Sequence, residues 1–155
     1  MLHLLEQGRP VPHLVLAGAH RKRAEQYINL PEHSLIRDKI HVVLNPNQSE
    51  LRNLYKNALA LVIPSKMEGW GLPLGEALWM GTPGLASTAP ALREVGGTLA
   101  QYFEPDDVTK LAGYIDMLHS DLAYRTKVRT HIQESRDQLR SWADVAQDIL
   151  RAVSA

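Results

Sequence analysis

The sequence predicts an α/β fold: a Rossmann-like parallel sheet of about five strands, with helices on both faces and further helices at the C-terminus. Short apolar segments alternate with helix-compatible segments along the first two thirds of the chain, as βαβ units require. Glycine, proline or asparagine separates most of these segments. After Asp107 the short apolar segments stop, and the rest of the chain has only helical periodicity.

The individual elements follow from these patterns. The expected strands are short apolar runs, at residues 11–18, 39–44, 59–63, 83–87 and 98–103. The expected helices are residues 19–30, 50–58, 73–80, 91–95, 108–119 and 121–140. Pro31 stops the first of them, and Ser49 is the expected N-cap of the second. Residues 121–140 form either one helix or a pair of helices. Ser141 caps a final helix with an apolar face made of Trp142, Val145, Ala146, Ile149, Leu150 and Val153.

Composition narrows the class of protein. The chain has 155 residues, 45% of them apolar, which is enough for one domain with a core, expected to span residues 1–155. Lys+Arg and Asp+Glu both number 17, so a broadly basic surface for nucleic acid is not expected. There is no cysteine, no apolar run that would span a bilayer, and no basic region like that of a signal peptide at the start. We therefore expect a cytoplasmic location.

The most informative segment is residues 64–84, PSKMEGWGLPLGEALWMGTPG. Two glutamates, Glu68 and Glu76, lie on either side of a glycine-rich turn, and Pro73 suits the first turn of a helix. A strand, a glycine-rich loop and a helix start in this order can hold a phosphorylated ligand. The backbone amides expected to point out of this helix start are those of Gly71, Leu72, Leu74 and Gly75. The carboxylates add acceptors for sugar hydroxyls.

A simpler interpretation of the same segment stays open at this point. Glu76 would then only favour a helix N-terminus through the dipole, which contributes about 0.3–1 kcal/mol. Gly69 and Gly71 would be ordinary turn residues. The spacing of two glutamates alone does not decide between the two interpretations.

Residues 59–107 resemble a known family, the retaining, nucleotide-sugar-dependent glycosyltransferases of family 4 (glycosyl transferases group 1). The segment 64–84 resembles the signature P-S-x-x-E-G-[aromatic]-G-L-P-x-x-E-A-x-x-x-G-x-P. Residues 53–60 (NLYKNALA), 91–97 (ALREVGG) and 102–107 (YFEPDD), and Ser141-Trp142 before the last helix, are also similar to the family. The resemblance covers about residues 11–155.

The resemblance implies the GT-B arrangement, in which two Rossmann-like domains face each other across a cleft. The chain resembles most of the C-terminal, donor-binding half, truncated at its N-terminal edge. The family's first strand and its acceptor domain have no counterpart, and residues 2–7 resemble a remnant of the helix after that strand. Expected partners are therefore a UDP-, GDP- or ADP-sugar, together with the missing acceptor domain or a second copy of the chain.

The resemblance also assigns roles to residues. Glu68 would act beside the transferred sugar as the candidate catalytic residue, and Glu76 would bind the ribose hydroxyls. The other expected donor-binding residues are Gly69, Trp70, Gly71 and Leu72 around the sugar and phosphate, Leu74 through its N–H, Lys66 at a phosphate, and Gly18, Leu44 and Asn45 near the base. Three positions depart from the family pattern: Gly75, Gly84 and Asn45. The first two glycines should loosen local packing, by roughly 0.5–1 kcal/mol each.

The implied activity is transfer of a sugar from a nucleoside diphosphate to a glycan, lipid-linked or other acceptor, with retention of configuration. No metal or other cofactor is expected, and the seven histidines are scattered without a ligand motif. A dehydrogenase is disfavoured because Gly18 is not followed by G-x-G-x-x-G spacing. An epimerase or phosphorylase stays possible. The alternative from another class is a non-catalytic module that binds a nucleotide sugar or a partner protein.

Overall fold

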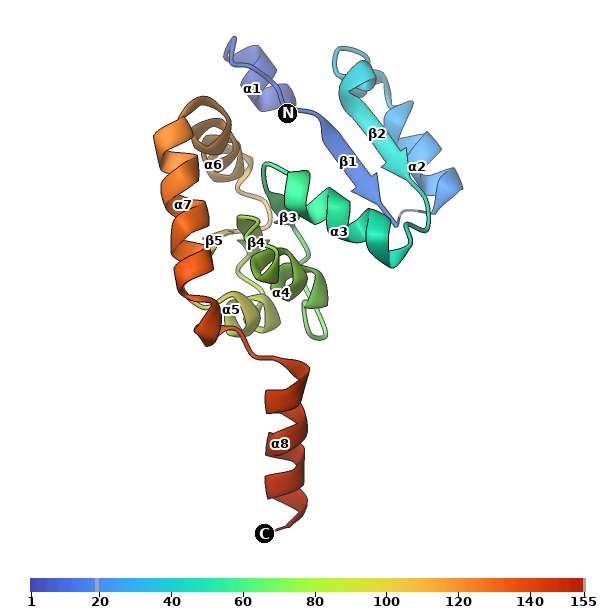
Figure 1. Ribbon diagram of the computed structural model, residues 1–155. Helices are drawn as coiled ribbons and strands as arrows, with labels where there is room; N and C mark the ends of the chain where they lie inside the picture. The colour runs from blue at the N-terminus through green and yellow to red at the C-terminus, as the bar shows by residue number, and fades with distance from the viewer. Residues whose placement is uncertain (19, 155) are drawn as a thin grey trace.

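The fold contains the five predicted strands, all of them parallel to their neighbours (Figure 1). The computed structural model describes residues 1–18 and 20–154, so Ala19, at the start of a predicted helix, and Ala155 lie outside the described residues. The strands are shorter than predicted: β1 (Leu14–Ala17), β2 (Ile40–Val43), β3 (Leu61–Ile63), β4 (Gly84–Ser87) and β5 (Ala100–Phe103).

The α/β fold class is confirmed, but the five parallel strands form two sheets where a single sheet of about five was predicted. β1 pairs with β2, and β3, β4 and β5 form a separate sheet in that order. In the doubly wound order 3-2-1-4-5-6 the first strand stands between the second and the fourth. The observed order places the break at the position of that first strand. Accordingly, β1 and β3 are not hydrogen-bonded to each other.

Helices fill the connections between strands and the C-terminal third. They are α1 (Leu2–Glu6), α2 (Arg21–Ile28), α3 (Gln48–Asn57), α4 (Leu72–Trp79), α5 (Pro90–Gly96), α6 (Val108–Ser120), α7 (Leu122–Glu134) and α8 (Trp142–Val153), with 3-10 turns at Pro31–His33, Arg37–Lys39 and Arg136–Gln138. Ser49 is not the N-cap of α3. Asn47 caps it instead, because its side chain and that of Glu50 exchange hydrogen bonds with each other's backbone N–H in a capping box.

The β3–β4–β5 sheet has helices on both faces, as predicted. Leu85 and Phe103 point to one face, where they pack with Leu118 of α6. Ala86, the next residue along β4, points to the other face and packs with Leu74 of α4 and with α5. The alternation follows from the period of two in a strand. Every residue of β4 is buried, as expected for the middle strand of a parallel sheet.

The smaller sheet is joined to the rest through α1 and α6. Leu4 and Val11 pack with Ala112 of α6 in one apolar cluster. The Arg9 guanidinium forms an ion pair with Asp116 of α6, with Nε 3.0 Å from Oδ1. These contacts connect the N-terminal sheet to the C-terminal helices around the break.

Arg129 of α7 holds the ends of two helices near the loop of interest. Its guanidinium donates to the carbonyl oxygens of Ala58, 2.6 Å away at the end of α3, and of Gly81, 3.3 Å away after α4. Carbonyls at a helix C-terminus have no partner within the helix, so this arginine satisfies one at each end. Burial lowers the pKa of the Arg129 guanidinium. The contacts fix how α3 and α4 lie next to each other.

Helix α8 extends away from the other elements (Figure 1). Its predicted apolar face exists, but its large side chains are exposed: Trp142, Ile149, Leu150 and Val153. Ser141 caps the helix, as predicted, in a capping box with Asp144. No helix of the described residues combines the length and apolar character needed to cross a membrane.

Candidate functional site

The loop between β3 and α4 is shaped by Gly71. This residue is the N-cap of α4 and has left-handed backbone angles, φ 81° and ψ 31°. A Cβ at this position would lie 2.7 Å from Cδ2 of Leu92 in α5. Both the backbone conformation and the close approach of α5 therefore require glycine. The turn places the helix start at the carboxyl edge of the sheet, where parallel α/β sheets bind ligands.

Only part of the predicted set of amides is free at this helix start. The N–H of Leu74 donates to the carbonyl of Gly71 at 2.9 Å, and the N–H of Gly75 reaches the same oxygen at 3.4 Å. The expectation that these two amides point freely outwards is therefore wrong, because the first turn of α4 closes on itself; the Leu74 side chain is also fully buried. Within the described residues, no hydrogen bond occupies the amides of Gly71 and Leu72.

Glu76 lies one turn into α4 and is exposed. Its Oε2 accepts a hydrogen bond from the hydroxyl of Tyr55, 2.9 Å away on α3. Burial raises the pKa of Tyr55, and the hydrogen bond to the Glu76 carboxylate raises it further. Tyr55 therefore stays a neutral donor and orients one oxygen of Glu76, leaving the other oxygen for a ligand. Sequence reasoning missed this contact, because nothing in a local pattern relates Tyr55 to a residue 21 positions later.

Glu68 and Lys66 lie in the loop before Gly71. Glu68 is half-buried, and no hydrogen bond or ion pair from the described residues reaches its carboxylate. The Lys66 ammonium lies 3.2 Å from Oδ2 of Asp106, which belongs to the loop after β5. Both side chains of this pair are mostly exposed, so the contact is a weak tie between two loops at the same sheet edge.

The predicted base-binding residues lie at the ends of the other sheet. Gly18 follows β1 with φ 75°, and its N–H donates to the carbonyl of Val43 at 2.9 Å. Asn45 follows β2, after Leu44, with φ 46°. Among non-glycine residues asparagine tolerates this conformation well, which explains physically why it can stand where the family usually has glycine. Among the described residues, no hydrogen bond joins these strand ends to the loop of Glu68 and Glu76.

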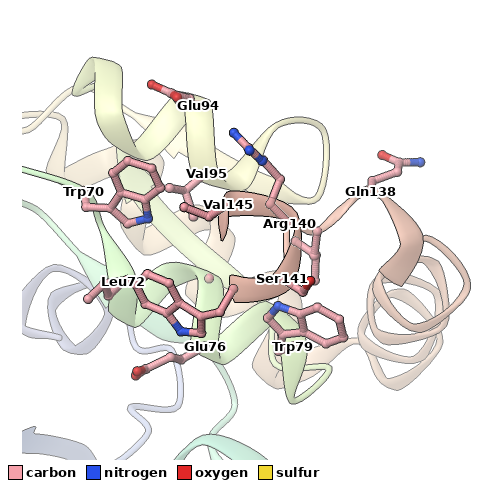
Figure 2. A pocket seen from close by; sticks show the side chains of 13 residues that line it. Trp70, Leu72, Glu76, Trp79, Glu94, Val95, Gln138, Arg140, Ser141 and Val145 are labelled. Atoms are coloured by element: carbon pink, nitrogen blue, oxygen red, sulfur yellow. The ribbon is translucent and has the colours of Figure 1, made fainter. Parts of the chain in front are cut away.

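A cavity of about 300 Å³ lies on the outer side of α4 (Figure 2). It is lined by Trp70, Leu72, Gly75, Glu76, Trp79, Glu94, Val95, Gln138, Leu139, Arg140, Ser141, Trp142 and Val145. Of the predicted site residues it brings together Trp70, Leu72 and Glu76, but not Glu68, Gly69, Gly71, Leu74 or Lys66. Figure 2 shows the Glu76 carboxylate at the lower edge, directed away from the rings of Trp70 and Trp79. We call this cavity the tryptophan pocket.

The two unusual glycines do not loosen the packing as expected. A Cβ on Gly84 would lie 2.4 Å from Cδ1 of Leu74, so the Leu74 side chain already fills the space above β4. A Cβ on Gly75 would lie 3.3 Å from Cγ1 of Val95, so this glycine lets α5 pack closely against α4. The expectation of loose packing is therefore wrong at Gly84, where a smaller residue is matched by a larger neighbour.

The described residues include no group of three or more His, Cys, Asp or Glu side chains that could hold a metal ion. Two histidines do meet: Nδ1 of His13, just before β1, lies 2.8 Å from Nε2 of His41 in β2. They are only two, and they lie far along the chain from the loop before α4.

Comparison with known proteins points to one family. Residues 1–135 match the family model described as glycosyl transferases group 1. The O-antigen chain mannosyltransferase RfbU of Salmonella typhimurium is 40% identical over 72 residues, 46% of this chain and 20% of the relative. The MMP alpha-(1->4)-mannosyltransferase of Mycolicibacterium hassiacum is 32% identical over 114 residues, 72% of this chain and 28% of the relative. The chain thus spans less than a third of the length of these curated relatives.

Solved structures show the same fold. Sucrose-phosphate synthase from Thermosynechococcus elongatus superposes with a TM-score of 0.80 at 24% identity, over 99% of this chain and 40% of that protein. The catalytic domain of Starch Synthase IV from Arabidopsis thaliana superposes with a TM-score of 0.69 at 17% identity, over 99% of this chain and 34% of that protein. The arrangement of strands and helices is therefore shared with one part of each of these larger proteins.

Proposed function

Because this chain belongs to the glycosyl transferases group 1 family, we propose that it forms the donor-binding half of a glycosyltransferase. The donor would be a nucleoside diphosphate sugar that binds at the start of α4. The observation that carries the proposal is the loop at Gly71, which combines unoccupied amides with the exposed carboxylate of Glu76 on the same helix. An anion at a helix start and a hydroxyl-binding carboxylate one turn later suit a phosphorylated ribose.

Each residue of the site would have a separate role in the transfer of the sugar. The amides of Gly71 and Leu72 and the α4 dipole would stabilise the charge that builds on the leaving diphosphate. Lys66 would add a positive charge once it leaves Asp106. Glu68, which has no partner among the described residues, would hold hydroxyls of the transferred sugar. The Tyr55 hydroxyl would keep the Glu76 carboxylate oriented toward the ribose.

We propose mannose as the transferred sugar and retention of configuration as the outcome. The names of several relatives support mannose, among them RfbU and the serotype-specific mannosyltransferase WbdA of Escherichia coli, which is 30% identical over 92% of this chain. Retention follows from the family resemblance alone. Donors with guanine, uracil and adenine are compared in the titration below to identify the base.

The chain is expected to need a partner for catalysis. A reacting donor and acceptor must both be held in position, and the relatives are more than three times as long as the part that matches. We propose that an acceptor-binding domain supplies the other wall, with no divalent metal or other cofactor at the donor. The cytoplasmic location and the homo-oligomer expected from the sequence stay predictions.

Calorimetric titration with GDP-mannose, UDP-glucose and ADP-glucose tests the donor site. We expect saturable binding of one donor, and about 10- to 100-fold weaker binding by Glu76→Gln, because a hydrogen bond to a charged group is lost. Glu134→Gln, which changes an exposed carboxylate on α7, is the matched control and should bind like the wild type. If all three donors fail to bind, or if Glu76→Gln binds as tightly as the control, the donor-site proposal is wrong and a partner-binding module becomes the better interpretation.

A further inference from the structure

We propose that the tryptophan pocket is a second carbohydrate site, which binds an uncharged saccharide next to the donor loop. The chain has three tryptophans, at positions 70, 79 and 142, and all three line this one cavity. They come from the loop before α4, the end of α4 and the start of α8, so no local sequence pattern brings them together. The concentration of every indole around one cavity is the observation that needs a functional explanation.

Two of the three indoles are largely exposed to solvent. Trp142 is 73% exposed and Trp70 is 49% exposed, and exposed tryptophans gathered in one place usually mark a binding surface. Trp79 has the Arg136 guanidinium over its ring, 5.4 Å from the ring centre, which fixes the orientation of the indole. Figure 2 shows the indole rings of Trp70 and Trp79 among the side chains that line the cavity. The weakly polar C–H faces of a pyranose ring can stack on such indoles.

The polar groups at the rim favour a neutral, hydroxyl-rich ligand. No hydrogen bond or ion pair from the described residues reaches Glu94, so its carboxylate is available to accept hydroxyl protons. Gln138 adds an amide at the opposite edge. The only basic side chain of the lining is Arg140, and it is paired with Asp148 of α8. The rim is therefore slightly acidic, which disfavours a diphosphate and is compatible with an uncharged saccharide.

Size and position agree with this ligand. About 300 Å³ is at the small end of the range of roughly 300–1,000 Å³ for ligand pockets, which suits one or two sugar rings. The Glu76 carboxylate bonds to Tyr55 on the α3 side and points away from the rings of Trp70 and Trp79. The donor loop and the tryptophan pocket thus meet along α4, where Trp70, Leu72 and Glu76 belong to both. The proposal does not depend on transferase activity by this chain.

Intrinsic tryptophan fluorescence tests the pocket directly, because every indole of the chain lies in it. We titrate the chain with α-linked mannobiose and with maltose and expect a saturable change in intensity or emission maximum. Trp142→Ala should weaken saccharide binding about tenfold or more, measured by calorimetry, because it removes one stacking face. Leu150→Ala, on the same helix but outside the lining, is the matched control and should bind like the wild type.

The donor and saccharide proposals fail in different ways. Glu68→Gln, in the donor loop but outside the lining of the tryptophan pocket, should weaken donor binding and keep saccharide binding, so the two measurements distinguish failure of one proposal from failure of the other. The pocket proposal is overturned if neither disaccharide binds at millimolar concentration. It is also overturned if GDP-mannose competes with the disaccharide for the same site. A third contrary result is a fluorescence change that follows protein concentration and a dimer on size exclusion, since a second copy would then cover the indoles.

Discussion

Gly71 is the residue that most constrains the loop before α4. Its φ of 81° suits glycine, and the side chain of Leu92 occupies the place where a Cβ would stand. Replacing this glycine would destabilise the fold in two ways. A residue with a side chain loses roughly 1–2 kcal/mol in the left-handed conformation, and overpacking against Leu92 adds about 1–3 kcal/mol. A second glycine, Gly8, has φ 66° but no atom within 4 Å of its Cβ position. A substitution at Gly8 would therefore strain the backbone without causing overpacking.

We therefore predict that Gly71→Ala lowers the free energy of unfolding more than Gly8→Ala does, by about 1–3 kcal/mol. Urea denaturation of both variants and the wild type measures the difference. The Gly71→Ala variant should also bind the donor more weakly, because the amides of the loop would move with the backbone. Equal losses of stability in the two variants would show that Leu92 does not press on this position.

At the scale of elements, the break between the two sheets makes strands with similar apolar sequences differ in burial. β1 and β4 are both short apolar strands, yet Val15 of β1 is 42% exposed whereas β4 is buried throughout. β4 has a hydrogen-bonded neighbour on each side, and β1 has one only on the β2 side. The alternate amides of β1 that face the break therefore lack strand partners.

This asymmetry predicts the pattern of amide hydrogen exchange. Amides of β4 should exchange only with global unfolding, whereas amides of β1 should exchange through local opening at a lower free energy. Exchange followed by mass spectrometry on peptides that cover residues 14–17 and 84–87 measures both strands in one sample. Equal protection of the two peptides would mean that the edge of β1 is covered in solution.

Periodicity in the sequence predicted which segments are strands and helices, because most elements bury an apolar face; α8 is an exception, since its large apolar side chains are exposed. Periodicity failed where the outcome depends on residues distant in the chain. The hydrogen bond of Tyr55 to Glu76 joins two helices, and the filling of space above Gly84 by Leu74 depends on how α4 crosses β4. The three indoles converge only because the start of α8 lies next to α4. The family signature predicted the loop of Glu68 and Glu76, but only coordinates could show that the Leu74 amide is occupied.

For the molecule as a whole, the contact of Arg9 with Asp116 is the ion pair that joins the N-terminal sheet to the C-terminal helices within the described residues. The hydrogen bond from Arg9 holds the pKa of the Asp116 carboxyl below its ordinary value of 3.8. A carboxyl whose pKa is lower in the folded state stabilises the fold at a pH above the unfolded pKa. This stabilisation is lost as the pH falls through the folded pKa.

We therefore predict that Asp116→Asn is less stable than the wild type at pH 7 and that the two proteins approach each other in stability below about pH 4. Denaturation curves at pH 7, 5 and 3 measure the difference at each pH. Asp137→Asn is the control, since this exposed side chain has no partner among the described residues, and it should change little at any of the three values. If the gap between Asp116→Asn and the wild type stays constant from pH 7 to pH 3, the carboxylate charge does not hold the two parts together. The apolar cluster around Leu4 and Val11 would then have to carry that role alone.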